Sequence, residues 1–169
     1  MRVALVIFAL TLFLLSPSLS HAVSMTNDPK GFHNIVWGSP LKVRTDLETT
    51  RKGTNFVEYQ FKNTPPTFAN IPVESLRLST IDDQFARVTI RYQGEETHER
   101  ILAYLETEFG RTEHLPGQML RGLNQQYSWR GTESEINLTY QASTERGFIF
   151  LDSRTLAPRF NDLLADTAD

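Results

Sequence analysis

Residues 85–109 read FARVTIRYQGEETHERILAYLETEF, and this stretch decides the fold. Its first third alternates apolar and polar residues, which is typical of a β-strand with one buried face. The residues expected to point into the core are Ala86, Val88, Ile90 and Tyr92. After two glutamates, which suit the positive end of a helix dipole, apolar residues recur at helical spacing. The stretch therefore predicts a strand over 85–92 and a helix over 95–109, which Gly110 ends.

Strand patterns continue on both sides of this stretch. In chain order they cover 56–62, 73–81, 120–130, 135–142 and 148–151. Asp82-Asp83 lies between two alternating segments and predicts a hairpin turn. Ser39-Pro40 combines a capping hydroxyl with a proline that is tolerated at the first helical position. A short helix is therefore expected over 40–50.

The predicted order of elements is α-β-β-β-α-β-β-β. Runs of strands that follow a helix indicate the α+β class with an antiparallel meander sheet. The clean alternation of each strand indicates that only one sheet face is covered, so both helices are expected on one face. The repeated unit of a helix and three strands suggests an internal pseudo-duplication. The pattern leaves open whether the two units share one sheet.

The first 22 residues have the layout of a secretory signal peptide. Arg2 precedes an apolar run over 3–15, and small residues at Ser20 and Ala22 mark a cleavage site. The run is shorter than the roughly 20 residues that a transmembrane helix needs. We expect a periplasmic or secreted protein with no membrane anchor after cleavage. The expected division is a signal peptide over 1–22, a flexible leader over 23–30, a single α+β domain over 31–158 and a C-terminal tail over 159–169.

Composition excludes several classes of function. The chain holds no cysteine, which excludes disulfides, thiolate metal sites, cysteine nucleophiles and a lipidated cysteine. Lys and Arg number 17 against 20 Asp and Glu, so the charge gives no reason to expect nucleic-acid binding. No phosphate-binding glycine loop, nucleophile elbow or metal-binding histidine spacing occurs. No cofactor, metal or catalytic residue is predicted, and a non-enzymatic role is favoured over an enzymatic one.

One short motif carries a resemblance. Gly31-Phe32-x-x-Ile35-x-Trp37-Gly38 resembles the start of small exported bacterial proteins of unknown function. The order of elements is similar to β-lactamase-inhibitor-like α+β domains and to small outer-membrane assembly lipoproteins. The chain lacks the lipidated cysteine of the lipoproteins, and no functional residue of the inhibitors maps onto it. The resemblance implies a binding or interaction module.

Two groups of residues are candidates for an interaction surface. Arg87, Thr89 and Arg91 share the outward side of one predicted strand, where guanidinium groups could hold a carboxylate or an acidic partner. The alternative is an ordinary solvated sheet face. A second group is aromatic and lies on neighbouring strands, where it forms either a binding patch or the core beneath the helix. Its members are Tyr127, Trp129 and Tyr140, with Phe148 beside them.

These observations favour a periplasmic, non-enzymatic protein that binds another envelope protein through its sheet face. Two alternatives remain open at this point. A curved sheet over a helix could enclose a small ligand beside Trp129 and Tyr140. A histidine, an acid and a hydroxyl could also meet in space and form the site of an envelope hydrolase.

Overall fold

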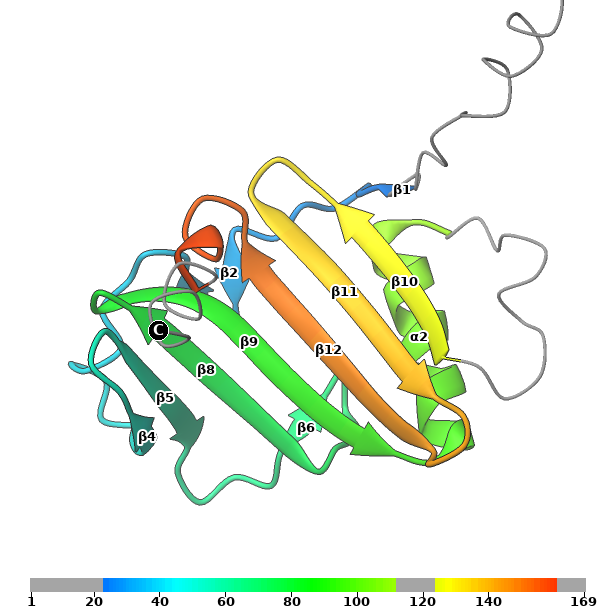
Figure 1. Cartoon of the computed structure of the whole chain (residues 1–169), viewed down its shortest axis with the longest axis horizontal. Coiled ribbons are helices and arrows are strands. Elements are labelled where there is room, and N and C mark those ends of the chain that lie inside the picture. Colours follow the sequence, from blue (N-terminus) through cyan, green and yellow to red (C-terminus); the bar gives the residue numbers. More distant parts are fainter. Residues whose placement is uncertain (1–22, 112–123, 161–169) are drawn as a thin grey trace, which may run out of the picture.

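The computed structural model describes residues 23–111 and 124–160. In this part of the chain, one eight-stranded sheet dominates, with strand order β1-β10-β11-β12-β9-β8-β5-β4 (Figure 1). Only β1 pairs in parallel, with β10, and every other neighbouring pair is antiparallel. The sheet strands are β1 (Val23–Ser24), β4 (Leu47–Lys52), β5 (Phe56–Phe61), β8 (Ser75–Ile81), β9 (Gln84–Gln93), β10 (Asn124–Arg130), β11 (Ser134–Gln141) and β12 (Arg146–Ser153). This mixed architecture agrees with the α+β class.

Helix α2 (Glu95–Phe109) follows β9 directly and lies behind the sheet in Figure 1. The predicted helix over 95–109 is confirmed, including both ends. Gly94 and Gly110 flank it with φ angles of 99° and 103°, which only glycine adopts without strain. Ile101 and Leu105 are fully buried, so the apolar stripe of the helix faces the sheet.

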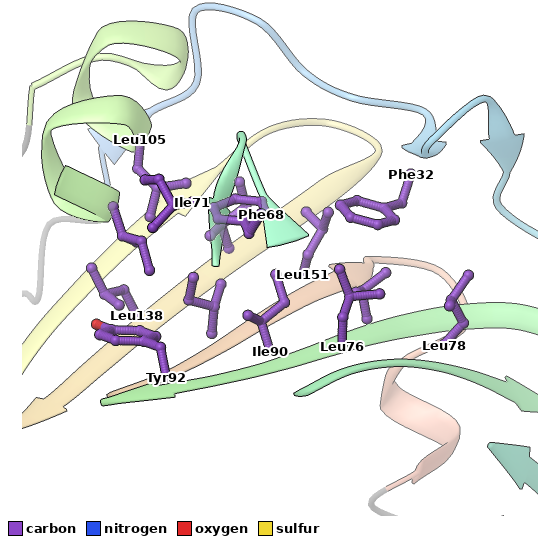
Figure 2. Close-up of a cluster of buried hydrophobic side chains, with 14 of the residues drawn as sticks. Phe32, Phe68, Ile71, Leu76, Leu78, Ile90, Tyr92, Leu105, Leu138 and Leu151 are labelled. Atoms are coloured by element: carbon purple, nitrogen blue, oxygen red, sulfur yellow. The ribbon is translucent and has the colours of Figure 1, made fainter. Parts of the chain in front are cut away.

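The main core lies between the sheet and the helix (Figure 2). Leu105 of α2 points toward the sheet, and Ile90 and Tyr92 of β9 point toward α2. Beside α2, the same face is covered by Phe68, whose ring meets Tyr104 of α2 edge-on with centroids 5.4 Å apart. Phe32 stacks on Phe68 with centroids 6.5 Å apart and extends this cover. These phenylalanines belong to two small hairpins, β2 (Gly31–Phe32) with β3 (Ile35–Val36) and β6 (Thr67–Phe68) with β7 (Ile71–Pro72).

Three hairpins turn through pairs of residues with positive φ. The pairs are His33-Asn34, Ala69-Asn70 and Asp82-Asp83. Two consecutive positive φ angles are typical of a type I′ turn, whose twist matches that of the two strands it connects. The predicted hairpin across Asp82-Asp83 is therefore confirmed, as the turn between β8 and β9.

The predicted helix over 40–50 is wrong. Residues 41–46 form a bend and short turns with no helix, and β4 begins at Leu47 and pairs with β5 at the edge of the sheet. Leu41 is buried, but Val43 is 70% exposed, so these apolar residues do not form one buried face as they would in an amphipathic helix. The element order α-β-β-β-α-β-β-β is corrected accordingly, since a strand stands where the first helix was expected.

The segment over 23–30, expected to be a loose leader, is hydrogen bonded to the end of the sheet. Val23–Ser24 forms β1, and the amides of Met25 and Thr26 donate to the carbonyls of Arg130 and Phe109. Asp28 accepts from the backbone amides of Glu133 and Ser134, at 2.7 and 3.0 Å. This carboxylate ties the segment to the turn between β10 and β11. The prediction of a flexible leader is therefore corrected.

A β-bulge interrupts the alternation of β9. Thr80 pairs with Phe85 and Ser79 with Arg87, so Ala86 is the extra residue. Ala86 is buried in a second small cluster with Ile81 and Leu156 instead of in the main core. The prediction that Ala86 shares the inward side of Val88 is thus wrong, although the residue is buried. The predicted strand over 120–130 is described only from Asn124 onward, and the tail only as far as Phe160.

Candidate functional site: a groove on the open face of the sheet

The sheet has one face that α2 does not cover, and we call it the open face. Arg87, Thr89 and Arg91 lie on it, because they alternate along β9 with Val88, Ile90 and Tyr92 of the core. Figure 1 looks onto this face, with residues 154–160 in front of the sheet. These residues form a turn that leads into helical residues 158–160, and we call them the C-terminal turn. The structure therefore keeps the three residues on one surface, as the alternation predicted.

A groove with a volume of about 630 Å³ runs along the open face. It is bounded by β9 and β12 on one side, by the end of β4 and the start of β5 on the other, and by Phe160 of the C-terminal turn. Its charged and aromatic lining consists of Arg51, Arg87, Arg91, Glu58, Phe56, Phe148, Phe150 and Phe160. We call this hollow the Arg–Phe groove.

Each arginine of the groove lies over an aromatic ring. The Arg91 guanidinium is 5.7 Å from the centroid of the Phe148 ring, and Arg51 is 5.2 Å from that of Phe56. Arg87 lies between two rings, 5.1 Å from the centroid of Phe150 and 4.8 Å from that of Phe160. Such contacts hold the planar groups against the groove wall while their N–H edges remain able to donate.

The three arginines differ in how they are neutralised. Arg87 donates from Nε and Nη2 to the two carboxylate oxygens of Asp152, at 2.6 and 3.0 Å. Asp152 is 9% exposed, and burial raises the pKa of its carboxyl while the hydrogen bond from Arg87 opposes that rise. The guanidinium groups of Arg51 and Arg91 have no ion pair with any residue that the structure describes. These two arginines are exposed, and Arg51 stands opposite Glu58 in the β4–β5 ladder.

The lining of the groove is therefore positive within an acidic protein. Three arginines face a single glutamate, Glu58, whereas the whole chain has a formal net charge of −3. The half-buried phenylalanine rings between the charges supply an apolar floor. A groove with this lining favours a ligand that combines negative charge with apolar surface.

The aromatic candidates lie on the other face of the sheet, beneath α2. Trp129 and Tyr140 are 0% and 2% exposed, and the Trp129 indole donates to the carbonyl of Gly110 at 2.7 Å. Tyr127 is half-buried and packs against the same core. The six candidate residues thus do not form one surface, since the arginine group and the tyrosine and tryptophan group are separated by the sheet. Phe148, grouped with them in the sequence, lies instead in the Arg–Phe groove.

His98 of α2 is a buried titratable group on that side. Its Nδ1 lies 2.7 Å from the Tyr92 hydroxyl, and its Nε2 lies 3.1 Å from Gln125 Oε1. Its ring stacks on Tyr140 with centroids 4.0 Å apart. Burial lowers the pKa of His98, which favours a neutral imidazole packed in the core. These partners are a phenol and an amide, and they satisfy the ring without a carboxylate.

Sequence reasoning missed most of the groove. Arg51 and Phe56 lie in a region expected to follow a helix, and Phe160 lies in the segment expected to be a C-terminal tail. The available signal was the spacing of Phe148 and Phe150, which places both rings on the same side of a strand as Arg87 and Arg91 once the strands pair. That pairing joins segments more than fifty residues apart, which the local pattern does not specify.

Comparisons of the chain with protein-family models, curated proteins and solved structures give no match. In the described ranges, no group of three or more His, Cys, Asp or Glu residues is placed to hold a metal ion. No helix within those ranges is long and apolar enough to cross a membrane.

Proposed function

We propose that this protein is an exported, non-enzymatic binding module that docks another envelope protein on the open face of its sheet. The observation that carries the proposal is the Arg–Phe groove. It combines an apolar floor with two exposed arginines that have no ion pair in the described part of the chain. Protein interfaces are enriched in arginine and aromatic residues, and arginines held on rings are ready to donate.

Export is proposed on the first 22 residues. Arg2, the apolar run over 3–15 and the small residues before Val23 support a cleaved signal peptide. The structure adds a compatible detail, because residues from Val23 onward take part in the sheet and its hydrogen bonds. A cleavage after Ala22 would leave these contacts intact.

The buried face supports a binding role less well than the open face does. A small-ligand carrier would need Trp129 and Tyr140 to line an apolar cavity. Both side chains are instead packed in the core cluster, and Trp129 is held by its bond to Gly110. A hydrolase would need a histidine with a carboxylate and a nucleophilic hydroxyl, whereas His98 is bonded to Tyr92 and Gln125. We therefore place the function on the open face.

Site-specific photo-crosslinking in the envelope tests this proposal. A photoreactive residue replaces Thr89, in the middle of the groove, or Ala103, an exposed position of α2. We expect a discrete adduct with a second protein from position 89 and none from position 103. The adduct should weaken when Arg91→Gln is added to the position 89 variant. The same adducts from both positions, or none from position 89, would contradict docking on the open face.

A further inference from the structure

We propose that the Arg–Phe groove binds an extended peptide segment in which two acidic residues flank an apolar residue at alternate positions, in the order acidic–x–apolar–x–acidic. This inference rests on the proposed function and names the chemistry of the segment that docks. It follows from the spacing of the arginines, the position of the rings between them and the charge that is left unpaired.

The spacing of the arginines selects an extended ligand. Arg87 and Arg91 are four residues apart on β9, with Thr89 between them on the same face. At about 3.3 Å per residue, their Cα atoms are about 13 Å apart. One carboxylate does not span that separation. An extended peptide repeats its side chains on one face with the same period, so acidic residues at positions i and i+4 match the spacing of the two arginines along β9.

The rings place the apolar residue at the centre. Phe148 pairs with Arg91 across the β9–β12 ladder, and Phe150 pairs with Thr89. Directly opposite residues have Cβ atoms about 5 Å apart, so the Phe150 side chain starts beside Thr89, and its ring lies 5.1 Å from the Arg87 guanidinium. A side chain at position i+2 of the ligand would meet this ring. Burying it there removes apolar surface of both partners from water.

The positive charge of the groove explains why the proposed peptide carries acidic residues. Arg91 is the stronger attachment point, because it is exposed and has no ion pair with a described residue. Arg87 uses Nε and Nη2 for Asp152, which leaves its Nη1 group available to a second carboxylate. Arg51 lies across the groove on β4 and adds a third positive charge that attracts an acidic segment.

Binding of synthetic peptides to the full chain tests the inference. The probe is a fluorescein-labelled peptide with the sequence Glu-Thr-Phe-Thr-Glu between glycines, followed by fluorescence anisotropy at low and moderate salt. Two matched peptides replace both glutamates with glutamine, or place the glutamates side by side. We expect the probe to bind more tightly than either, and its affinity to fall with salt because its carboxylates bind guanidinium groups.

Protein variants locate the binding. Arg91→Gln should weaken binding of the probe about tenfold, since hydrogen bonds to charged groups contribute at least that factor. It should leave the glutamine peptide unaffected. Arg100→Gln, at an exposed position of α2, is the matched control and should change nothing. Thr89→Glu should abolish binding by placing a negative charge between the arginines. Both groove variants alter side chains that are at least partly exposed, and thermal unfolding checks that they remain folded.

Several results would overturn the inference. These are equal binding of the three peptides, an Arg91→Gln variant that binds as the wild type does, or a single-stranded oligonucleotide that binds the groove more tightly than the probe. Its failure is distinguishable from that of the proposed function. If the peptides do not bind but the adduct from position 89 persists, the open face docks a protein by other chemistry. If neither is observed, both proposals fail.

Discussion

At the scale of single residues, the structure assigns different tasks to side chains that look alike in the sequence. Arg87 and Arg91 occupy equivalent outward positions of β9, yet Arg87 neutralises a buried carboxylate whereas Arg91 does not. Removing Arg87 would leave Asp152 buried without its partner, which costs stability as well as charge. A substitution of Arg91 therefore tests binding alone, whereas a substitution of Arg87 affects both binding and stability.

His98 gives the first prediction at this scale, which concerns the effect of pH on stability. Burial holds the pKa of His98 below its ordinary value of 6.5. Below pH 6.5 the unfolded chain binds a proton that the folded chain resists, so the free energy of unfolding should fall as the pH drops. Above pH 6.5 this contribution is complete. The slope should stay below about 1.4 kcal/mol per pH unit, which is the value for one proton.

Urea unfolding at a series of pH values between 5 and 8 measures this effect. His98→Gln should flatten the profile over this range. His33 is the natural comparison. Partial burial also lowers the pKa of His33, but this residue is classed as exposed whereas His98 is buried. His33→Gln should therefore change the profile less. A profile that is unaltered by His98→Gln would show that this imidazole does not titrate differently in the folded and unfolded chains.

At the scale of elements, a close approach between β9 and β12 fixes how two strands meet under the helix. Gly147 pairs with Tyr92, and the aromatic ring of Tyr92 covers the glycine, so that a methyl group built there would overlap the ring. Tyr92 in turn holds His98 of α2 through its hydroxyl. The glycine thus allows one tyrosine to connect β9, β12 and α2.

Gly147→Ala should therefore destabilise the protein by about 1–3 kcal/mol, the usual cost of overfilling a packed core. Thermal or urea unfolding measures the loss. The matched test is the same substitution in a Tyr92→Leu background, where the ring is gone and the added methyl group has room. There the cost should be much smaller. An equal cost in both backgrounds would mean that the ring does not cause the crowding.

How far the sequence predicts these elements depends on whether their signals are local. The helix over 95–109 has a strong apolar stripe and a glycine at each end, and its boundaries were predicted correctly. The helix over 40–50 was predicted from a capping signal and a weak apolar stripe. Leu47–Lys52 instead pairs with β5 as the edge strand β4, because tertiary pairing outweighs a weak local helix signal. Asn34 and Asn70 have positive φ in the turns of the two small hairpins, as Asp83 has in the turn between β8 and β9. Asn and Asp tolerate this conformation, so both small hairpins could have been predicted from these asparagines.

The candidate site was predictable only in part, and for a related reason. The outward positions of Arg87, Thr89 and Arg91 follow from the alternation of one strand. The rings that complete the groove come from β5, β12 and the C-terminal turn, and only tertiary pairing brings them together. The bulge at Ala86 also changes which residues share a face, and nothing in the local pattern indicates it. The sequence therefore located the arginines but not the groove around them.

At the scale of the whole molecule, the two faces of the sheet have opposite characters. One face is covered by α2 and the small hairpins and buries nearly all the large aromatic side chains of the core. On the other face, no element of residues 23–111 or 124–160 covers the middle, which carries positive charge and phenylalanine rings in the groove. The second small cluster closes only the end of this face, beneath the C-terminal turn. This asymmetry is the physical basis for placing the function on the open face.

The central claim is that ligands bind on this open face, and side-chain NMR tests it most directly. The Nε–Hε resonances of the arginines of the full chain are followed while the Glu-Thr-Phe-Thr-Glu peptide is added. The account predicts that the signals of Arg91 and Arg87 shift in proportion to occupancy while that of Arg100 on α2 stays fixed. Shifts confined to Arg100 and the helix side, with the groove arginines unmoved at saturation, would contradict it.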